Sequence, residues 1–366
     1  MAVVIVNNTG GSITSGTTYV GGVAPTSIDS IAFTPTSGNL IVDALINISG
    51  IDFTNCVSVI NFTQPLNLNN TVGHTHFVNL GTGGYTLSGT PEIKYADTFL
   101  GTAISLTSNG IPWNGILNLS CSTTNNNITL VDDWNQNGEL ISPSTIQCKF
   151  LGNTFNINGI CNALRISVDN TSIINLNGNI NLTGFLFYGG HLKYTGGICN
   201  IDTLSVVPTS TVILDIAGVT INNLVNISSS VAVSIQLNSV PIFPELRVSS
   251  SSFPISFIGD YGFIADLLFI GRTTFNRQLI LNSNVEYVVN DTIDITNASI
   301  SSCTPGVKSK LTLGQNINQK RLTNIDATDI DSSGGRRVNN FFGTATNCDN
   351  WRIWTDCTLP QVSSTF

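Results

Sequence analysis

The sequence predicts an all-β protein folded as a right-handed parallel β-helix, a solenoid of roughly 21-residue coils. Three observations predict this fold class. Strand-like segments recur at a nearly regular spacing, residues that favour strands and turns dominate the composition, and charged residues make up only 10% of the 366 residues. Hydrophobic residues form 41% of the chain and recur throughout, so the low charge does not indicate disorder.

The repeat is clearest in the middle of the chain. Segments in which apolar and hydroxyl residues alternate, such as LVNISSSVAVSIQL at residues 224–237, begin at anchor positions that lie 18 to 24 residues apart. Three short strands joined by tight turns fit a coil of this length. The anchors are Leu117, Leu140, Leu164, Leu186, Leu204, Leu224, Leu246, Leu267 and Val288.

We expect the inward side chains to stack from coil to coil, about 4.8 Å apart, as one apolar column. Leu224 and Leu246 should lie in this column, whereas Ser229 and Ser250 should face solvent. Asn, Ser and Thr at the turns can form hydrogen bonds between neighbouring coils. The variable coil length disfavours a left-handed hexapeptide helix, and a string of β-sandwiches is the alternative fold.

Three sections are expected: residues 1–39 lead into the solenoid, residues 40–303 form it, and residues 304–366 form a distinct C-terminal section. This last section carries 7 basic and 5 acidic residues, whereas residues 1–303 carry 7 basic and 17 acidic ones. It either caps the open edge of the solenoid or docks on a partner, because aromatic residues and Arg are enriched in interfaces. The interface candidates are Arg336, Arg337, Phe341, Phe342, Trp351, Arg352 and Trp354.

Charge and hydropathy disfavour several classes of partner. The net charge of −8 argues against nucleic acid as the main partner. The start, MAVVIVNNTGG, lacks the pattern of a signal peptide, and no run of 18 apolar residues exists, so we expect no membrane insertion. The eight cysteines are scattered without C-x-x-C spacing, which predicts buried thiols.

The motif GHTHF is the candidate metal site. Side chains alternate along a strand, so His74 and His76 should point to the same face. A symmetric trimer could then bring three such pairs to its axis and offer six imidazoles to one transition metal. The alternative is a pair of exposed or hydrogen-bonded histidines in an early turn. No other cofactor is expected.

The polar stretch LVDDWNQNGE is the candidate glycan site. Asp132 and Asp133 are adjacent carboxylates, and Trp134 beside them could stack on a sugar ring. The alternative is an ordinary loop between coils. Because the chain has only four Glu residues, little general-acid chemistry is available, and we expect no enzymatic activity.

The run LTNIDAT…SSGG…GTATNC resembles the final rungs of β-helical virion and tail proteins of tailed bacteriophages. This resemblance covers a small part of the chain, and its motifs are structural. It implies a homotrimeric component of the particle surface, bound to other virion proteins of the capsid or tail. Fibres and spikes of this kind also use His-x-His motifs to bind metal.

These observations together predict a non-enzymatic structural protein of a tailed-phage virion, made in the host cytoplasm. A capsid decoration or cement protein, or a short tail fibre, fits best. The alternative is a tailspike that binds or depolymerises host-surface polysaccharide. A bacterial surface adhesin would need a secretion signal or an anchor.

Overall fold

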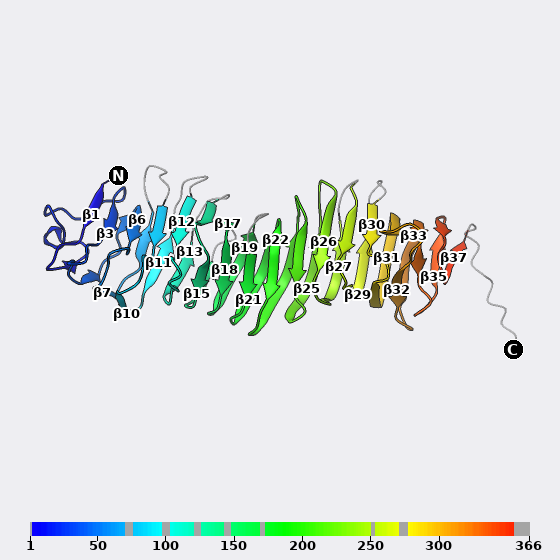
Figure 1. The fold of residues 1–366 in the computed structure, drawn as a ribbon. Helices are drawn as coiled ribbons and strands as arrows, with labels where there is room; N and C mark the ends of the chain where they lie inside the picture. Colours follow the sequence, from blue (N-terminus) through cyan, green and yellow to red (C-terminus); the bar gives the residue numbers. More distant parts are fainter. Residues whose placement is uncertain are drawn as a thin grey trace. The chain divides into compact units, whose positions relative to one another are not determined.

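The chain divides into two compact units, and each is a parallel β-solenoid (Figure 1). Unit 1 comprises residues 1–204 and 218–220, and unit 2 comprises residues 205–217 and 221–366. The chain makes about 12 turns in all, so the predicted right-handed β-helix is confirmed. The computed structural model describes residues 2–69, 76–96, 103–120, 126–142, 148–168, 173–249, 253–270 and 277–354.

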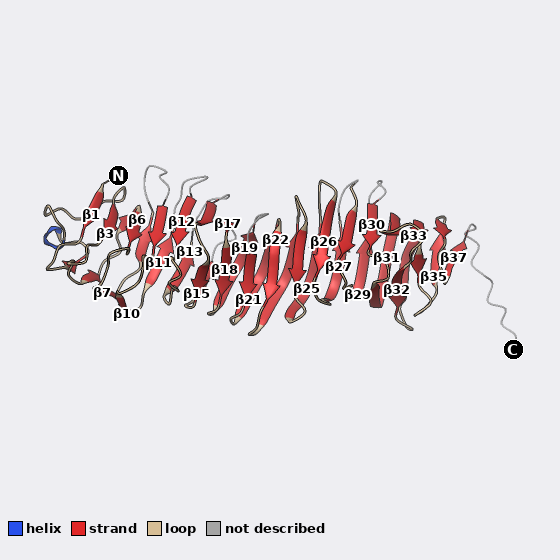
Figure 2. Cartoon of the chain, in the orientation of Figure 1, coloured by secondary structure: helices blue, strands red, loops and turns tan. Residues whose placement is uncertain are grey.

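Strands form nearly all of the regular structure (Figure 2). The exception in the described part is the 3-10 turn η1 (Gly16–Thr18) near the N-terminus. Within the same described residues, no helix has the length and apolar character needed to cross a membrane.

In unit 1 the large sheet forms three parallel ladders of strands. The first joins β1 (Val3–Ile5), β3 (Ser30–Ala32), β6 (Gly50–Asp52), β9 (His76–Asn79), β12 (Ala103–Thr107), β14 (Asn126–Leu130), β17 (Cys148–Gly152), β19 (Cys161–Val168) and β21 (Ile180–Phe187). The second joins β5 (Asn47–Ile48), β8 (Leu66–Leu68), β11 (Glu92–Tyr95), β13 (Ile116–Leu119), β16 (Leu140–Ser142) and again β19. The third joins β15 (Trp134–Gln136), β18 (Thr154–Ile157), β20 (Ile173–Leu176) and β22 (Gly190–Tyr194).

Residues 1–39 already take part in strand pairing. β1 opens the first ladder, and β2 (Gly11–Ser12) starts a separate four-stranded parallel sheet. This sheet continues with β4 (Leu40–Val42), β7 (Val59–Phe62) and β10 (Thr86–Gly89). The segment that was expected to lead into the solenoid is therefore built into unit 1.

Unit 2 repeats the same construction. Two strands, β23 (Cys199–Val206) and β25 (Val219–Ile227), contribute residues to both units. One ladder of unit 2 joins β25, β27 (Ile242–Val248), β29 (Ile264–Ile270) and β31 (Glu286–Ser302). Another joins β24 (Val212–Asp215), β26 (Val233–Leu237), β28 (Ile255–Ile258), β30 (Arg277–Leu281) and the second half of β31.

Strand pairing continues past Cys303. β31 pairs in parallel with both β32 (Ser309–Leu313) and β33 (Asn318–Thr328). The chain then adds β34 (Ile330–Asp331), β35 (Val338–Phe341), β36 (Thr344–Thr346) and β37 (Trp351–Trp354). Residues 304–354 are therefore further coils, so the change of composition after Cys303 is not a change of architecture.

The core is a column of apolar side chains that stack from coil to coil. In unit 2, Val225 pairs with Leu246, and Leu246 pairs with Leu268, which pairs with Ile293. All four side chains are at most 1% exposed. The expectation that Leu246 belongs to the column is confirmed.

Leu224 does not occupy the column, contrary to expectation. It is half-buried, and its neighbour Val225 takes the inward position. Within β25 the inward side chains are Val219, Ile221, Val225 and Ile227, so Leu224 falls between inward positions. Because the longer strands turn a corner between two faces of a coil, alternation cannot be extrapolated through them. Residues 161–163 of β19, for example, pair with β16, whereas residues 166–168 pair with β17.

Ser229 is also placed differently from the expectation. It is 3% exposed, and its hydroxyl donates to the carbonyl oxygens of Pro208 and Val231, both at 2.9 Å. This serine therefore bonds one coil to the next inside unit 2. Ser250 lies outside the described residues.

Coil length varies around the predicted value. Val225 pairs with Leu246, 21 residues further on, whereas the paired residues are 18 apart at Cys148 and Ile166. The longest step described, 29 residues, separates Gly11 from Leu40. The differences in coil length therefore lie in the turns, while the strands keep their register.

Asparagine side chains form ladders on the surface of unit 1. Asn137 donates to Asn114 Oδ1 at 3.0 Å, Asn158 to Asn137 at 3.0 Å, and Asn177 to Asn158 at 3.2 Å. Each amide can donate to the coil before it and accept from the coil after it, so one residue type extends the ladder through every coil. This explains why a chain so poor in charge is rich in asparagine.

A column of glycines follows the same asparagines. Gly138, Gly159, Gly178 and Gly197 each lie directly against a glycine carbonyl of the preceding coil. A Cβ atom placed on Gly159 would be 2.2 Å from Gly138 O, and one on Gly178 would be 1.9 Å from Gly159 O. The stacking distance therefore requires glycine at these positions.

The Asn158→Ala variant should lower the free energy of unfolding by about 1 kcal/mol, because it removes two ladder hydrogen bonds from an exposed row. Asn158 donates to Asn137 and accepts from Asn177, so both neighbours lose a partner. Urea unfolding followed by circular dichroism measures the change. The exposed Asn179, which is not in this ladder, is the control, and an equal loss for Asn179→Ala would contradict a role for the ladder.

The five cysteines whose side chains the structure describes carry free thiols, as predicted, but not all are buried. Cys56, Cys161 and Cys199 are buried, whereas Cys348 is half-buried and Cys303 is exposed. Burial raises the pKa of Cys56 to about 11 and that of Cys199 to about 12. These buried thiols act as small apolar side chains.

Candidate functional site

His76 is an interior residue. It opens β9, its side chain is 0% exposed, and Nδ1 lies 3.1 Å from the carbonyl oxygen of Ser49. Its ring also meets the edge of Tyr95 at 5.5 Å between centroids. The expectation that His76 points outward to a trimer axis is therefore corrected, because the alternation of β9 turns it inward. His74 lies outside the described residues.

Across the described ranges, no three His, Cys, Asp or Glu side chains gather in a way that could hold a metal ion.

The carboxylates of Asp132 and Asp133 join neighbouring coils. Asp132 accepts the backbone N–H groups of Ser108 at 2.7 Å and Asn109 at 2.6 Å. Asp133 accepts the backbone N–H of a residue in the next coil, Thr154, at 2.9 Å. The two carboxylates thus link their own coil to the coil before it and the coil after it.

Trp134 is buried in the core and 0% exposed. Its indole Nε1 donates to Gln136 Oε1 at 3.2 Å. The expectation that this ring stacks on a sugar is therefore wrong, because the inward position in β15 removes it from the surface. From the sequence alone, an aromatic residue in a loop could not be distinguished from one that points inward from a strand.

The predicted interface candidates lie on the last coils of unit 2. Arg336 and Arg337 are exposed, and each donates one hydrogen bond, to Ile317 O at 2.8 Å and to Asn350 Oδ1 at 3.3 Å. Phe341 is 37% exposed and Phe342 is 48% exposed. These four side chains give the end of the chain a surface that is both basic and aromatic.

The remaining candidates are less uniform. Arg352 is exposed, whereas Trp351 is half-buried and donates from Nε1 to Ser332 Oγ at 3.1 Å. Trp351 therefore contributes to packing between coils. Trp354 ends β37, and its side chain lies outside the described part.

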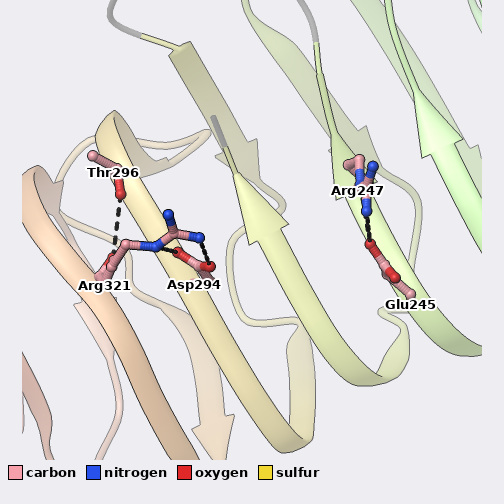
Figure 3. A network of polar contacts seen from close by, with 5 residues as sticks. All are labelled: Glu245, Arg247, Asp294, Thr296 and Arg321. Atoms are coloured by element: carbon pink, nitrogen blue, oxygen red, sulfur yellow. Dashed lines mark hydrogen bonds and ion pairs between the residues drawn. The ribbon is translucent and has the colours of Figure 1, made fainter. Parts of the chain in front are cut away.

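A charged groove in unit 2 was not predicted from the sequence. It has a volume of about 400 Å³. Figure 3 shows four of its charged residues, Glu245, Arg247, Asp294 and Arg321. Five of its nine lining residues are charged, in a chain where only 10% are. The groove is lined by Glu245, Arg247, Ser249, Leu267, Phe269, Arg277, Thr292, Asp294 and Arg321.

The strand register arranges these residues in two rows. Arg247 pairs with Phe269, and Phe269 pairs with Asp294, so one row crosses three coils. The second row consists of Glu245, Leu267 and Thr292. Residues two apart on a strand share a face, which brings both rows to the outer surface.

The first ion pair lies within β27. Arg247 donates from Nε at 3.0 Å and from Nη2 at 2.5 Å, in both cases to Glu245 Oε1 (Figure 3). The guanidinium carbon lies 5.2 Å from the centroid of the Phe269 ring, within the range of a cation–π contact. Two partners thus hold Arg247 in one orientation.

The second ion pair joins β31 and β33. Arg321 donates from Nε to Asp294 Oδ1 at 3.1 Å and from Nη2 to Oδ2 at 2.5 Å, a bidentate geometry. The side chain of Asp294 is 7% exposed and that of Arg321 is 49% exposed. The register shifts between Ile293 and Ile295, so β33 carries an extra residue here that turns Arg321 toward Asp294. The hydrogen bond with Asp294 raises the pKa of Arg321.

Arg277 is the third cation of the groove. It is 8% exposed and donates from Nη1 to Val248 O at 3.1 Å. Burial lowers the pKa of its guanidinium, because water stabilises the charge less there. With three arginines and two carboxylates, the lining has a formal charge of +1, whereas the chain has −8.

No protein-family model, no curated protein and no solved structure matches this chain.

Proposed function

We propose that this chain is a non-enzymatic structural component of a tailed-phage virion, exposed on the particle surface as a homotrimer. A capsid decoration or cement protein, or a short tail fibre, is the role we favour. The coil-to-coil ladders support this proposal most directly. Outward residues such as Asn137, Asn158 and Asn177 hold successive coils together, which suits a rigid, durable surface component.

The use of the carboxylates also supports a structural role. Asp132 and Asp133 accept backbone N–H groups of neighbouring coils, and Asp294 is held by a bidentate arginine. Each of these carboxylates is therefore occupied in bonds that hold neighbouring coils together.

The exposed basic and aromatic surface of Arg336, Arg337, Phe341 and Phe342 is our candidate for attachment to the particle. A net positive end on an acidic chain fits an acidic surface on a capsid or tail protein. The same coils can also cap the solenoid. Their strands would do this by pairing, while their exposed side chains remain available for attachment.

The Arg336→Ser, Arg337→Ser double variant should fold and assemble as wild type but bind particles about tenfold more weakly at low salt, since two cations leave the interface. Wild-type binding should weaken as salt rises. The measurement is occupancy on particles that lack this protein, with added density located on the capsid or tail by electron microscopy. The mass of the assembly in solution checks the trimer.

The exposed Lys310→Ser variant, which removes a cation from another part of the last coils, is the control. Equal occupancy of the double variant and the wild type at every salt concentration would contradict attachment through this surface. Absence of the protein from both capsid and tail would contradict the virion role itself.

The alternative role, a spike that binds host-surface polysaccharide, is favoured by one observation, the charged groove of unit 2. Five charged residues around one groove are not required to stack coils.

A further inference from the structure

The charged groove presents partners for the two kinds of group that an acidic sugar carries, its carboxylate and its hydroxyls. Arg247 and Arg321 each use Nε and Nη2 for their ion pairs, so the Nη1 donors are not used in those pairs. Both donors of Arg247 bind Glu245 Oε1, and the second oxygen, Oε2, takes no part in that pair. The groove thus presents guanidinium donors beside a carboxylate acceptor.

The charge of the lining selects for an anion, but only for one of low charge density. A formal charge of +1 within an acidic chain attracts a negative group, and the planar fork of arginine matches a carboxylate. Glu245 and Asp294 lie in the same groove and would repel a chain of consecutive phosphates. Hydroxyl groups, in contrast, can donate to these carboxylates.

The groove is also fixed in shape. Its two rows cross three coils, a distance of about 10 Å, and every lining residue except Arg277 and Arg321 comes from the β27–β29–β31 ladder or the residue that follows β27. Arg247 is held by Glu245 and Phe269, and Arg321 by Asp294. A ligand therefore meets groups that are already oriented, which reduces the entropic cost of binding.

We infer that this groove binds a carboxylate-bearing sugar residue of an acidic polysaccharide, with the carboxylate at Arg247 and Arg321 and a hydroxyl at Glu245. This binding activity goes beyond the structural role proposed above and does not depend on where the protein sits on a particle.

Calorimetric titration of the full-length protein with trigalacturonate tests the inference. Its methyl ester is the matched ligand, because it keeps the rings and hydroxyls but lacks the charge. We expect the acid to bind at least about tenfold more tightly than the ester, with an affinity that falls as salt rises. No binding of the acid, or equal binding of the ester, would overturn the inference.

The Arg247→Gln variant should weaken the binding of trigalacturonate about tenfold and leave the urea unfolding curve nearly unchanged, because the Arg247–Glu245 pair is partly exposed. Arg337→Gln, which removes an exposed arginine outside the groove, should bind like the wild type. Equal affinity of all three proteins would place the sugar elsewhere and overturn the inference.

Two further ligands test whether the groove prefers a sugar carboxylate or a phosphate. Inorganic phosphate and a single-stranded DNA oligonucleotide should each bind more weakly than trigalacturonate, and tighter binding of either would overturn the assignment to a sugar acid. Trigalacturonate should be recovered intact after incubation. Release of shorter sugars would contradict the non-enzymatic role while leaving the binding site in place.

Discussion

Replacing Gly178 with alanine is expected to disrupt the stacking of coils in unit 1 strongly. The new Cβ would lie 1.9 Å from Gly159 O and 2.8 Å from the backbone of Asn158, so the backbone of one coil must move away from the next. Such overpacking costs about 3 kcal/mol. The displaced turn would also pull Asn177 from Asn158 in the ladder. Urea unfolding followed by circular dichroism should show a lower midpoint.

Gly334→Ala is the matched control for this change. Gly334 is exposed, and a Cβ there would meet only side-chain atoms, the nearest being Thr312 Oγ1 at 3.0 Å. A side-chain hydroxyl can rotate or shift, whereas the carbonyl of Gly159 belongs to a short backbone turn fixed between the paired strands β18 and β19. Similar losses of stability for Gly178→Ala and Gly334→Ala would mean that the close approach of the glycine column is not a constraint.

Replacing Leu246 with aspartate is expected to destabilise unit 2 by about 4 kcal/mol, because it removes an apolar side chain and buries a carboxyl group without water. Leu246 is 0% exposed and stacks between Val225 and Leu268 in successive coils. Soluble yield and the unfolding midpoint in urea measure the effect.

Asn226→Asp is the control on the neighbouring strand. Asn226 is half-buried and accepts a hydrogen bond from Ser249 at 2.8 Å, which a carboxylate can also accept. We expect this variant to stay close to the wild type. Leu224→Asp should be intermediate, since Leu224 is half-buried, and a loss as large as that of Leu246→Asp would return Leu224 to the column.

The fold could be predicted because a β-solenoid repeats. The period of strand-like segments and the scarcity of charge were sufficient to predict a parallel β-helix, and the pairing of Leu117 with Leu140 keeps the predicted register. Which individual residues of a strand point inward could not be predicted. A strand such as β29 places Ala265, Leu268 and Ile270 inward, so its alternation breaks between Ala265 and Leu268 without a signal in the apolar pattern.

The candidate sites were harder to predict for two physical reasons. Short motifs such as GHTHF and DDW are read as surface chemistry, yet His76 and Trp134 fill inward positions. The charged groove, in contrast, has no motif, because its ion pairs join residues as far apart as Asp294 and Arg321. Only the register of parallel strands brings them together, although charged residues two apart, as at Glu245 and Arg247, were a local sign.

The stacked asparagine–glycine turns also affect how this protein ages. An asparagine followed by glycine loses its amide readily, because the unhindered glycine nitrogen can attack the side-chain carbonyl carbon. In the folded coils, Gly138 N donates to Trp113 O at 3.1 Å and Gly159 N donates to Gln136 O at 3.1 Å. The attacking nitrogens and the amides of Asn137 and Asn158 are thus both held in place. These two asparagine–glycine dipeptides are protected for as long as the coils stay stacked, and deamidation at them should record past unfolding.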